Sequence, residues 1–117
     1  MYGGLAYLAW CLFARVAISL NVFACFDYFC HSPKWGRQRF ELIGAVNGGR
    51  NHWLIGLIAW GEGWHNNHHA MPASPRMGIG RYELDLGYSV IWVMKKFGLA
   101  WDVIQPVDAL RPNAVPK

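Results

Sequence analysis

The chain is poor in charge. Only 15% of its 117 residues are Asp, Glu, Lys or Arg, against about 25% in typical soluble domains. Hydrophobic residues make up 54%, and seven Trp, five Tyr and six Phe give a high aromatic content. At this length we expect one domain at most. The high apolar content and the low charged content indicate that part of the chain's apolar surface faces lipid.

Cysteine is also scarce. The three cysteines, Cys11, Cys25 and Cys30, lie in the apolar N-terminal third, and no Cys-x-x-Cys occurs. An odd number without such a motif argues against a disulfide framework and a zinc knuckle, and it indicates buried thiols in a reducing compartment. No basic segment precedes the first apolar run, and that run is too long for a signal peptide.

The formal net charge is +4, which raises the question of nucleic acid. The basic residues, however, are scattered along the chain rather than clustered in one stretch. This distribution is typical of segments next to a membrane, not of a nucleic-acid footprint. We therefore expect membrane lipid as a partner and no nucleic acid.

One long apolar run extends from Leu5 to Phe29. As a helix it would be roughly 37 Å long at about 1.5 Å per residue, which is enough to cross a bilayer with tilt. Arg15, near its middle, costs at least a few kcal/mol in lipid. Either Arg15 faces the interior of a helix bundle or the span begins after it, and both options require partner helices. The buried helix of a soluble protein stays open as an alternative.

The rest of the chain alternates loops and shorter helices. Residues 31–49 are polar and basic and indicate a loop with at most one short helix, on the cytoplasmic side by the positive-inside bias. Residues 53–60 are apolar but too short to span, which favours a buried or membrane-surface helix. Residues 70–80 contain two prolines and two glycines and indicate a loop. The spacing of apolar residues predicts a helix over 84–98, with Gly98 as its C-cap.

The string GEGWHNNHHA, residues 61–70, places three histidines within five positions. On a helix, His65, His68 and His69 share one side. Either all three bind one cation, or two bind one metal while the third reaches a neighbour. Without a nearby thiolate, imidazoles favour iron or zinc. Chance clustering on a solvated surface is the simpler alternative.

Three polar neighbours of the histidines are candidate supporting residues. Asn66 and Asn67 can donate or accept hydrogen bonds that fix imidazole tautomers. Glu62 can do the same, or can act as a base as in zinc hydrolases. A zinc hydrolase, however, usually carries His-Glu-x-x-His, which is absent here. The spacing therefore disfavours a hydrolase.

The string from Gly61 to His69 resembles the last histidine box of the membrane-bound fatty acid desaturases. The stearoyl-type delta-9 acyl desaturases, particularly bacterial ones, are the most similar group. The resemblance covers most of residues 20–105. It includes Arg50-Asn51-His52-Trp53 before the box, Pro72 after it, and Glu83 and Asp85 ahead of a C-terminal helix that ends in Gly98-Leu99-Ala100.

The resemblance implies a set of metal ligands. In that family two irons on the cytoplasmic face are held by histidines from several segments. His65, His68 and His69 match three ligand positions, and His31 matches another. Asp27 stands where the family has an asparagine associated with a metal-bound water, so it is a further candidate ligand through water.

Other positions depart from the family or match no ligand. Asn47 and Gly49 replace an Asp and a Ser that the family has between its histidine segments. His52 matches no ligand position and is expected to be a structural or surface histidine. Arg37 and Arg39 are candidates for holding an anionic headgroup.

The implied fold is all-α: the C-terminal part of the membrane-bound, histidine-rich diiron desaturase fold. Residues 1–117 then form one portion, with a transmembrane helix at about 5–29, a cytoplasmic metal-binding part at 31–105 and an irregular tail at 106–117. The implied location is a membrane, expected to be a bacterial inner membrane, with the metal site on its cytoplasmic face.

The implied reaction is oxygen-dependent desaturation of a fatty acyl chain linked to coenzyme A, a carrier protein or a lipid. Its cofactors are two Fe²⁺ ions, dioxygen is the co-substrate, and a ferredoxin or b-type cytochrome supplies electrons. The family's two earlier histidine boxes lie upstream of anything in this sequence, so we expect a fragment that is inactive alone. A related diiron membrane hydroxylase and a small membrane protein that binds metal or a partner without turnover stay open.

Overall fold

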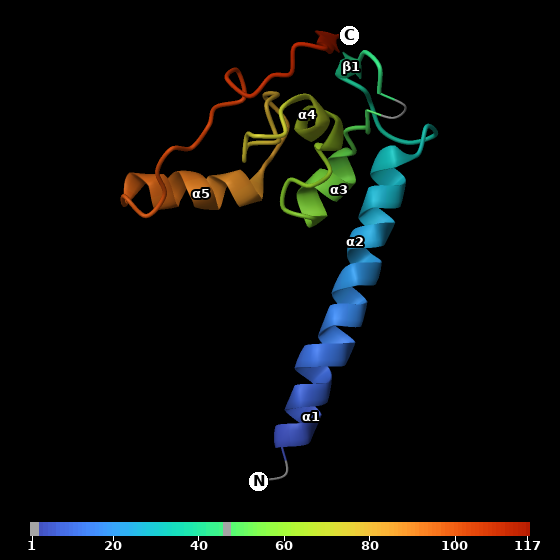
Figure 1. Cartoon of the computed structure of the whole chain (residues 1–117), viewed down its shortest axis with the longest axis vertical. Coiled ribbons are helices and arrows are strands. Elements are labelled where there is room, and N and C mark those ends of the chain that lie inside the picture. The colour runs from blue at the N-terminus through green and yellow to red at the C-terminus, as the bar shows by residue number, and fades with distance from the viewer. Residues whose placement is uncertain (1–2, 46–47) are drawn as a thin grey trace.

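A long N-terminal helix dominates the architecture (Figure 1). The structure is a computed structural model that describes residues 3–45 and 48–117. Helix α1 (Gly4–Ala9), the π-helical turn η1 (Trp10–Ala14) and helix α2 (Arg15–His31) follow one another without interruption. Within the described residues, this 28-residue segment, Gly4–His31, is the helix long and apolar enough to cross a membrane. The helix predicted over 5–29 is therefore present, and its apolar side chains face outward.

The polar residues of this helix bond to its own backbone. Asn21 Nδ2 donates to the carbonyl oxygen of Ala17 at 2.9 Å, and Arg15 Nε donates to that of Cys11 at 3.4 Å. Such bonds back to the preceding turn reduce the cost of carrying polar groups in an apolar environment. They are compatible with a helix that lies in lipid or among partner helices.

Short elements follow the long helix, beyond its C-terminal end (Figure 1). They are strand β1 (Phe40–Leu42), helix α3 (Trp53–Ile58), helix α4 (His65–Ala70), helix α5 (Leu86–Lys96) and strand β2 (Ala114–Pro116). The histidine string thus forms its own helix, α4. The apolar run after residue 52 forms α3, which is separated from α4 by a loop.

The two short strands were not predicted, since the expected fold is all-α. They pair antiparallel, with Phe40 opposite Pro116 and Leu42 opposite Ala114. We expected at most a short helix in 31–49 and an irregular tail over 106–117. Strands of three residues have no readable period of their own, and each of these is stabilised by a partner more than seventy positions away in the sequence. Apart from this small sheet the fold is helical, as predicted.

A small core lies between the sheet and the end of α4. It contains five buried side chains: Phe40, Leu42, Ala70, Met71 and Ala114. Ile79 and Ala109 pack against these five. Many large apolar side chains elsewhere stay exposed, among them Trp53, Trp60 and Phe97. The core therefore holds the histidine helix in place, while the remaining apolar surface is left for lipid or for other protein segments.

Helix α5 lies within the range 84–98 predicted from the sequence, but it begins at Leu86 and ends at Lys96. Asp85 Oδ1 accepts from the backbone N–H of Tyr88 at 2.8 Å, which caps the N-terminus. Lys95 and Lys96 occupy the last turn, and Gly98 follows with φ +70°. In Figure 1, α5 runs across the direction of the long N-terminal helix and lies beyond α3.

Candidate metal centre

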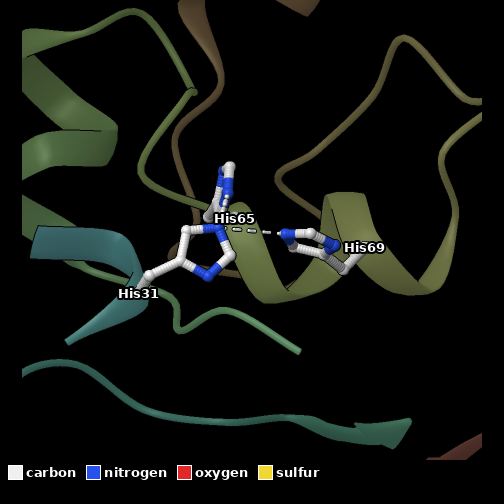
Figure 2. Close-up of side chains that lie close together, drawn as sticks. All are labelled: His31, His65 and His69. Atoms are coloured by element: carbon white, nitrogen blue, oxygen red, sulfur yellow. Dashed lines mark hydrogen bonds between the residues drawn. The ribbon is translucent and has the colours of Figure 1, made fainter. Parts of the chain in front are cut away.

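Three imidazoles from two helices meet at the centre of the folded part (Figure 2). His31 is the last residue of α2, and His65 and His69 lie one turn apart on α4. His31 Nε2 is 2.9 Å from His65 Nε2 and 3.4 Å from His69 Nε2. One candidate ligand nitrogen from each of the three lies within 4.8 Å of the others.

These separations suit a shared metal ion. Metal–nitrogen bonds of about 2.0–2.1 Å at angles of 90–109° place two ligand nitrogens roughly 2.9–3.4 Å apart. The two measured Nε2–Nε2 distances fall in this range. In the absence of an ion, the same contacts are hydrogen bonds between the rings. The residues present therefore fit a nitrogen-rich site for iron or zinc.

Asp27 lies at the edge of this cluster, one helical turn before His31. Its Oδ1 is 3.5 Å from His31 Nε2 and 3.6 Å from His65 Nε2. The side chain is 51% exposed, so part of it faces solvent or an additional ligand. A carboxylate at this position adds one negative charge beside the three imidazole rings.

His68 does not join the three other histidines. Its ring centroid is 5.9 Å from those of both His65 and His69, and its Nδ1 is buried without a hydrogen-bond partner among the described residues. Each residue of an α-helix advances about 100° around the axis, so positions i and i+4 are about 40° apart, while i+3 lies about 60° to the other side. Of the two arrangements that the sequence left open, this geometry favours two α4 histidines at one ion and the third directed elsewhere.

The environment keeps two of the rings neutral. Burial lowers the pKa of His65 from 6.5 to about 4, with the nearby imidazoles of His69, His31 and His68 acting in the same direction. The pKa of His69 is also lowered, first by burial and then by the neighbouring imidazoles of His31 and His68 and the cation of Arg111. Neutral imidazole is the form that binds a metal ion.

The two asparagines of the histidine string bind backbone and other polar side chains rather than imidazole. Asn66 Oδ1 accepts from the N–H groups of Arg39 and Phe40, both at 2.7 Å, and its Nδ2 donates to carbonyl oxygens at 2.8–3.3 Å. Asn67 Nδ2 donates to the Met77 carbonyl at 2.8 Å and to Glu83 Oε2 at 2.9 Å. Both side chains are buried, and they anchor α4 to the segments around it.

Gly49 packs closely against the rings of His65 and His69. Its φ is +65°, and a Cβ added there would lie 2.8 Å from His69 Cδ2 and 2.9 Å from His65 Cδ2. A larger residue would therefore displace both rings. The position was noted in the sequence only because the family has serine there. Asn47, noted for a similar reason, lies outside the described residues.

Two further candidates lie at the periphery of the cluster. Glu62 is exposed and lines a small cavity together with Asp27, Cys30 and His65. Glu62 is near the site but is not part of the cluster of His31, His65 and His69. His52 lines a separate cleft of about 800 Å³ and is not in the histidine cluster.

That cleft also contains the two arginines proposed for an anionic headgroup. Arg37 and Arg39 line it with aromatic side chains that include Trp35 and Trp53. Arg39 Nη1 is 3.2 Å from Glu83 Oε1, so its charge is partly compensated. Arg37 is exposed at the rim.

Two polar residues that organise the site had no role predicted from the sequence. Asn51 Oδ1 accepts from the N–H groups of Asn66 and Asn67, and Glu83 Oε2 accepts from Asn67 Nδ2 and from the N–H groups of Ile79 and Gly80. A buried amide or carboxylate with several backbone partners has no sequence pattern of its own. The only available signal was their place in the stretches that resemble the family.

Comparison with known proteins gives consistent matches. The family profile described as "Fatty acid desaturase" matches residues 1–103. Among curated proteins of Arabidopsis thaliana, the chain is 38% identical over 109 residues to Delta-9 desaturase-like 3 protein and 32% identical over 110 residues to Delta-9 acyl-lipid desaturase 1. These matches cover 93% and 94% of this chain, but 35% and 34% of the relatives.

A third relative differs in the position of its double bond. The chloroplastic palmitoyl-monogalactosyldiacylglycerol delta-7 desaturase of Arabidopsis thaliana is 34% identical over 107 residues, which cover 92% of this chain and 28% of the relative. The chain thus spans about a third of the length of the curated relatives that it matches. No solved structure gave a significant match.

Proposed function

This chain belongs to the fatty acid desaturase family, and we propose that it forms one wall of a diiron centre that introduces a double bond into a fatty acyl chain. The observation that carries the proposal is the meeting of His31, from the apolar helix, with His65 and His69 of α4. A ligand at the end of this apolar helix supports a centre close to the membrane surface. An acyl chain reaches the site from the same direction.

We assign the ligands to two positions. His31, His65 and His69 hold one ion, and Asp27 adds a carboxylate to it, directly or through a water molecule. His68 faces a second ion, because its ring is turned away and its buried Nδ1 has no partner among the described residues. The remaining ligands come from protein segments outside these 117 residues.

The overall reaction is balanced by two external electrons: R–CH₂–CH₂–R′ + O₂ + 2 e⁻ + 2 H⁺ gives R–CH=CH–R′ + 2 H₂O. The bound irons supply the dioxygen chemistry needed to break C–H bonds that no general base can deprotonate. This chain's own residues hold neutral imidazoles in place, keep the rings packed against Gly49 and present the site at the end of the apolar helix.

Substrate carrier, electron donor and location follow from the family and extend the proposal. The acyl chain is linked to coenzyme A, a carrier protein or a lipid, and a ferredoxin or b-type cytochrome delivers the electrons. Arg37, at the rim of the 800 Å³ cleft, is suited to an anionic headgroup. The metal side faces the cytoplasm, because the residues after the span are basic, and a bacterial inner membrane is the proposed membrane.

The test uses the complete reading frame, including any coding sequence upstream of Met1, in a host that lacks the corresponding unsaturated fatty acid. Gas chromatography of the fatty acids measures the product. We expect monoenoic product from the wild type and none from His65→Ala or His68→Ala, with loss of iron in both. Asn113→Ala, which removes an exposed side-chain hydrogen bond to the Ile43 carbonyl away from α4, is the matched control and keeps the product.

The other outcomes separate the alternatives. Unchanged monoenoic output from His65→Ala and His68→Ala would refute the ligand assignment. Hydroxylated fatty acid in place of the monoene would identify a related hydroxylase. A native gene that starts at Met1 and encodes no further histidine boxes would favour a non-enzymatic membrane protein.

A further inference from the structure

A two-residue segment, Arg50-Asn51, is hydrogen-bonded to both helices that carry the clustered histidines. The backbone N–H of Arg50 donates to the carbonyl oxygen of Cys30 at 2.7 Å, in the last turn of α2 and next to His31. Asn51 Oδ1 accepts from the N–H groups of Asn66 and Asn67 at 2.9 and 3.2 Å, in the first turn of α4. The segment therefore connects the ligand from one helix to the ligands from the other.

The contact at α4 is a helix cap supplied from outside the helix. The first N–H groups of any α-helix lack partners within it. Trp64 at the N-cap position makes no side-chain capping bond in the described structure. Asn51, fifteen positions before Asn66, provides the acceptor instead, and its Nδ2 donates to Asn67 Oδ1 at 2.8 Å.

Asn51 is itself rigidly held. Its backbone N–H and carbonyl oxygen both pair with Arg37, each at 2.8 Å, and the residue is 8% exposed. A cap that is fixed in this way determines where a helix of only six residues sits. Since His65 is the first residue of α4, any shift of the helix moves His65 and His69 relative to His31.

We propose that Asn51 is a positioning residue of the metal centre: it places His65 and His69 at bonding distance from the ion that His31 also binds. Asn51 touches neither metal nor substrate, and it acts through α4. This inference rests on the metal site of the proposed function, and it adds a residue that lies outside every histidine segment.

The experiment measures Co²⁺ binding to the full 117-residue chain in detergent micelles by titrating the cobalt absorption bands. The variants are Asn51→Ala, His31→Ala and the double variant Asn51→Ala with His31→Ala. Asn113→Ala is the matched control, because it removes one exposed amide hydrogen bond, to the Ile43 carbonyl, away from α4. Circular dichroism reports helix content for each variant.

We expect Asn51→Ala to weaken Co²⁺ binding on the order of tenfold. In the His31→Ala background, Asn51→Ala should change affinity by clearly less than tenfold, because Asp27 is then the one α2 ligand left to be aligned. A general loss of structure would lower affinity equally in both backgrounds.

Each contrary result has a distinct meaning. Wild-type affinity in Asn51→Ala, or an equal loss in both backgrounds, overturns the positioning role and leaves the metal site intact. If Asn51→Ala loses helix content, the His31→Ala background decides: the same loss of affinity there overturns the proposal. A wild-type chain that binds no Co²⁺ overturns the metal site, and this inference with it.

Discussion

Replacing Gly49 by alanine should disable the metal cluster while leaving the fold in place. The added Cβ would lie 2.8 Å from His69 Cδ2 and 2.9 Å from His65 Cδ2, whereas ordinary van der Waals contact begins near 3.4 Å. Each ring must therefore retreat by about 0.5 Å or more. Metal–ligand distances tolerate only about 0.2 Å. The left-handed φ of +65° adds strain of roughly 1–2 kcal/mol for a residue with a side chain.

Gly44→Ala separates the ring clash from the backbone strain. Gly44 has φ +82°, but a Cβ there meets nothing within 4 Å. Both variants thus carry the left-handed penalty, and only Gly49→Ala pushes on the histidines. We expect Co²⁺ affinity to fall more than tenfold in Gly49→Ala and to stay within about twofold of the wild type in Gly44→Ala. Equal affinities for the two variants would show that the rings are not held against Gly49.

Three more predictions address the surroundings of the site. Asp27→Asn removes one negative charge 3.5 Å from His31 Nε2 and should weaken Co²⁺ binding several-fold in the same titration; unchanged affinity would place Asp27 outside the coordination sphere. Because the pKa of His65 is lowered to about 4, its ring should be neutral at pH 6 in the metal-free chain, and a ring found protonated at pH 6 in an NMR titration would contradict this. In the metal-free chain the unfolded state then binds more protons than the folded state between pH 6.5 and 4, so stability falls as the pH falls through that window. Ala114→Asp puts an unpaired carboxylate into the small core and should cost about 2 kcal/mol or more in thermal unfolding, while Val115→Asp, on the exposed side of β2, should cost far less; similar losses would argue against the β1–β2 core.

The parts that the sequence predicts well are those encoded by local pattern. The long apolar run predicts the helix found at Gly4–His31, and the capping residues around 84–98 predict α5. The histidine string indicates the family on its own, and the family profile confirms it over residues 1–103. Each of these signals lies within one stretch of chain and needs no knowledge of packing.

The parts that the sequence misses depend on contacts between distant segments. Strand β1 exists because β2 pairs with it, and neither strand has a pattern long enough to identify it. The separation of His68 from its two neighbours depends on the side from which His31 approaches α4. The cap from Asn51 joins residues fifteen positions apart, so no periodicity reveals it.

The central claim is that His31 shares one metal ion with His65 and His69. X-ray absorption at the cobalt edge measures it most directly, with the Co²⁺-loaded chain compared with its His31→Ala variant. We predict three imidazoles around the ion in the wild type and two in the variant. The variant should therefore show weaker outer-shell scattering from imidazole rings. Identical spectra from the two proteins would contradict it, because His31 would then lie outside the metal centre.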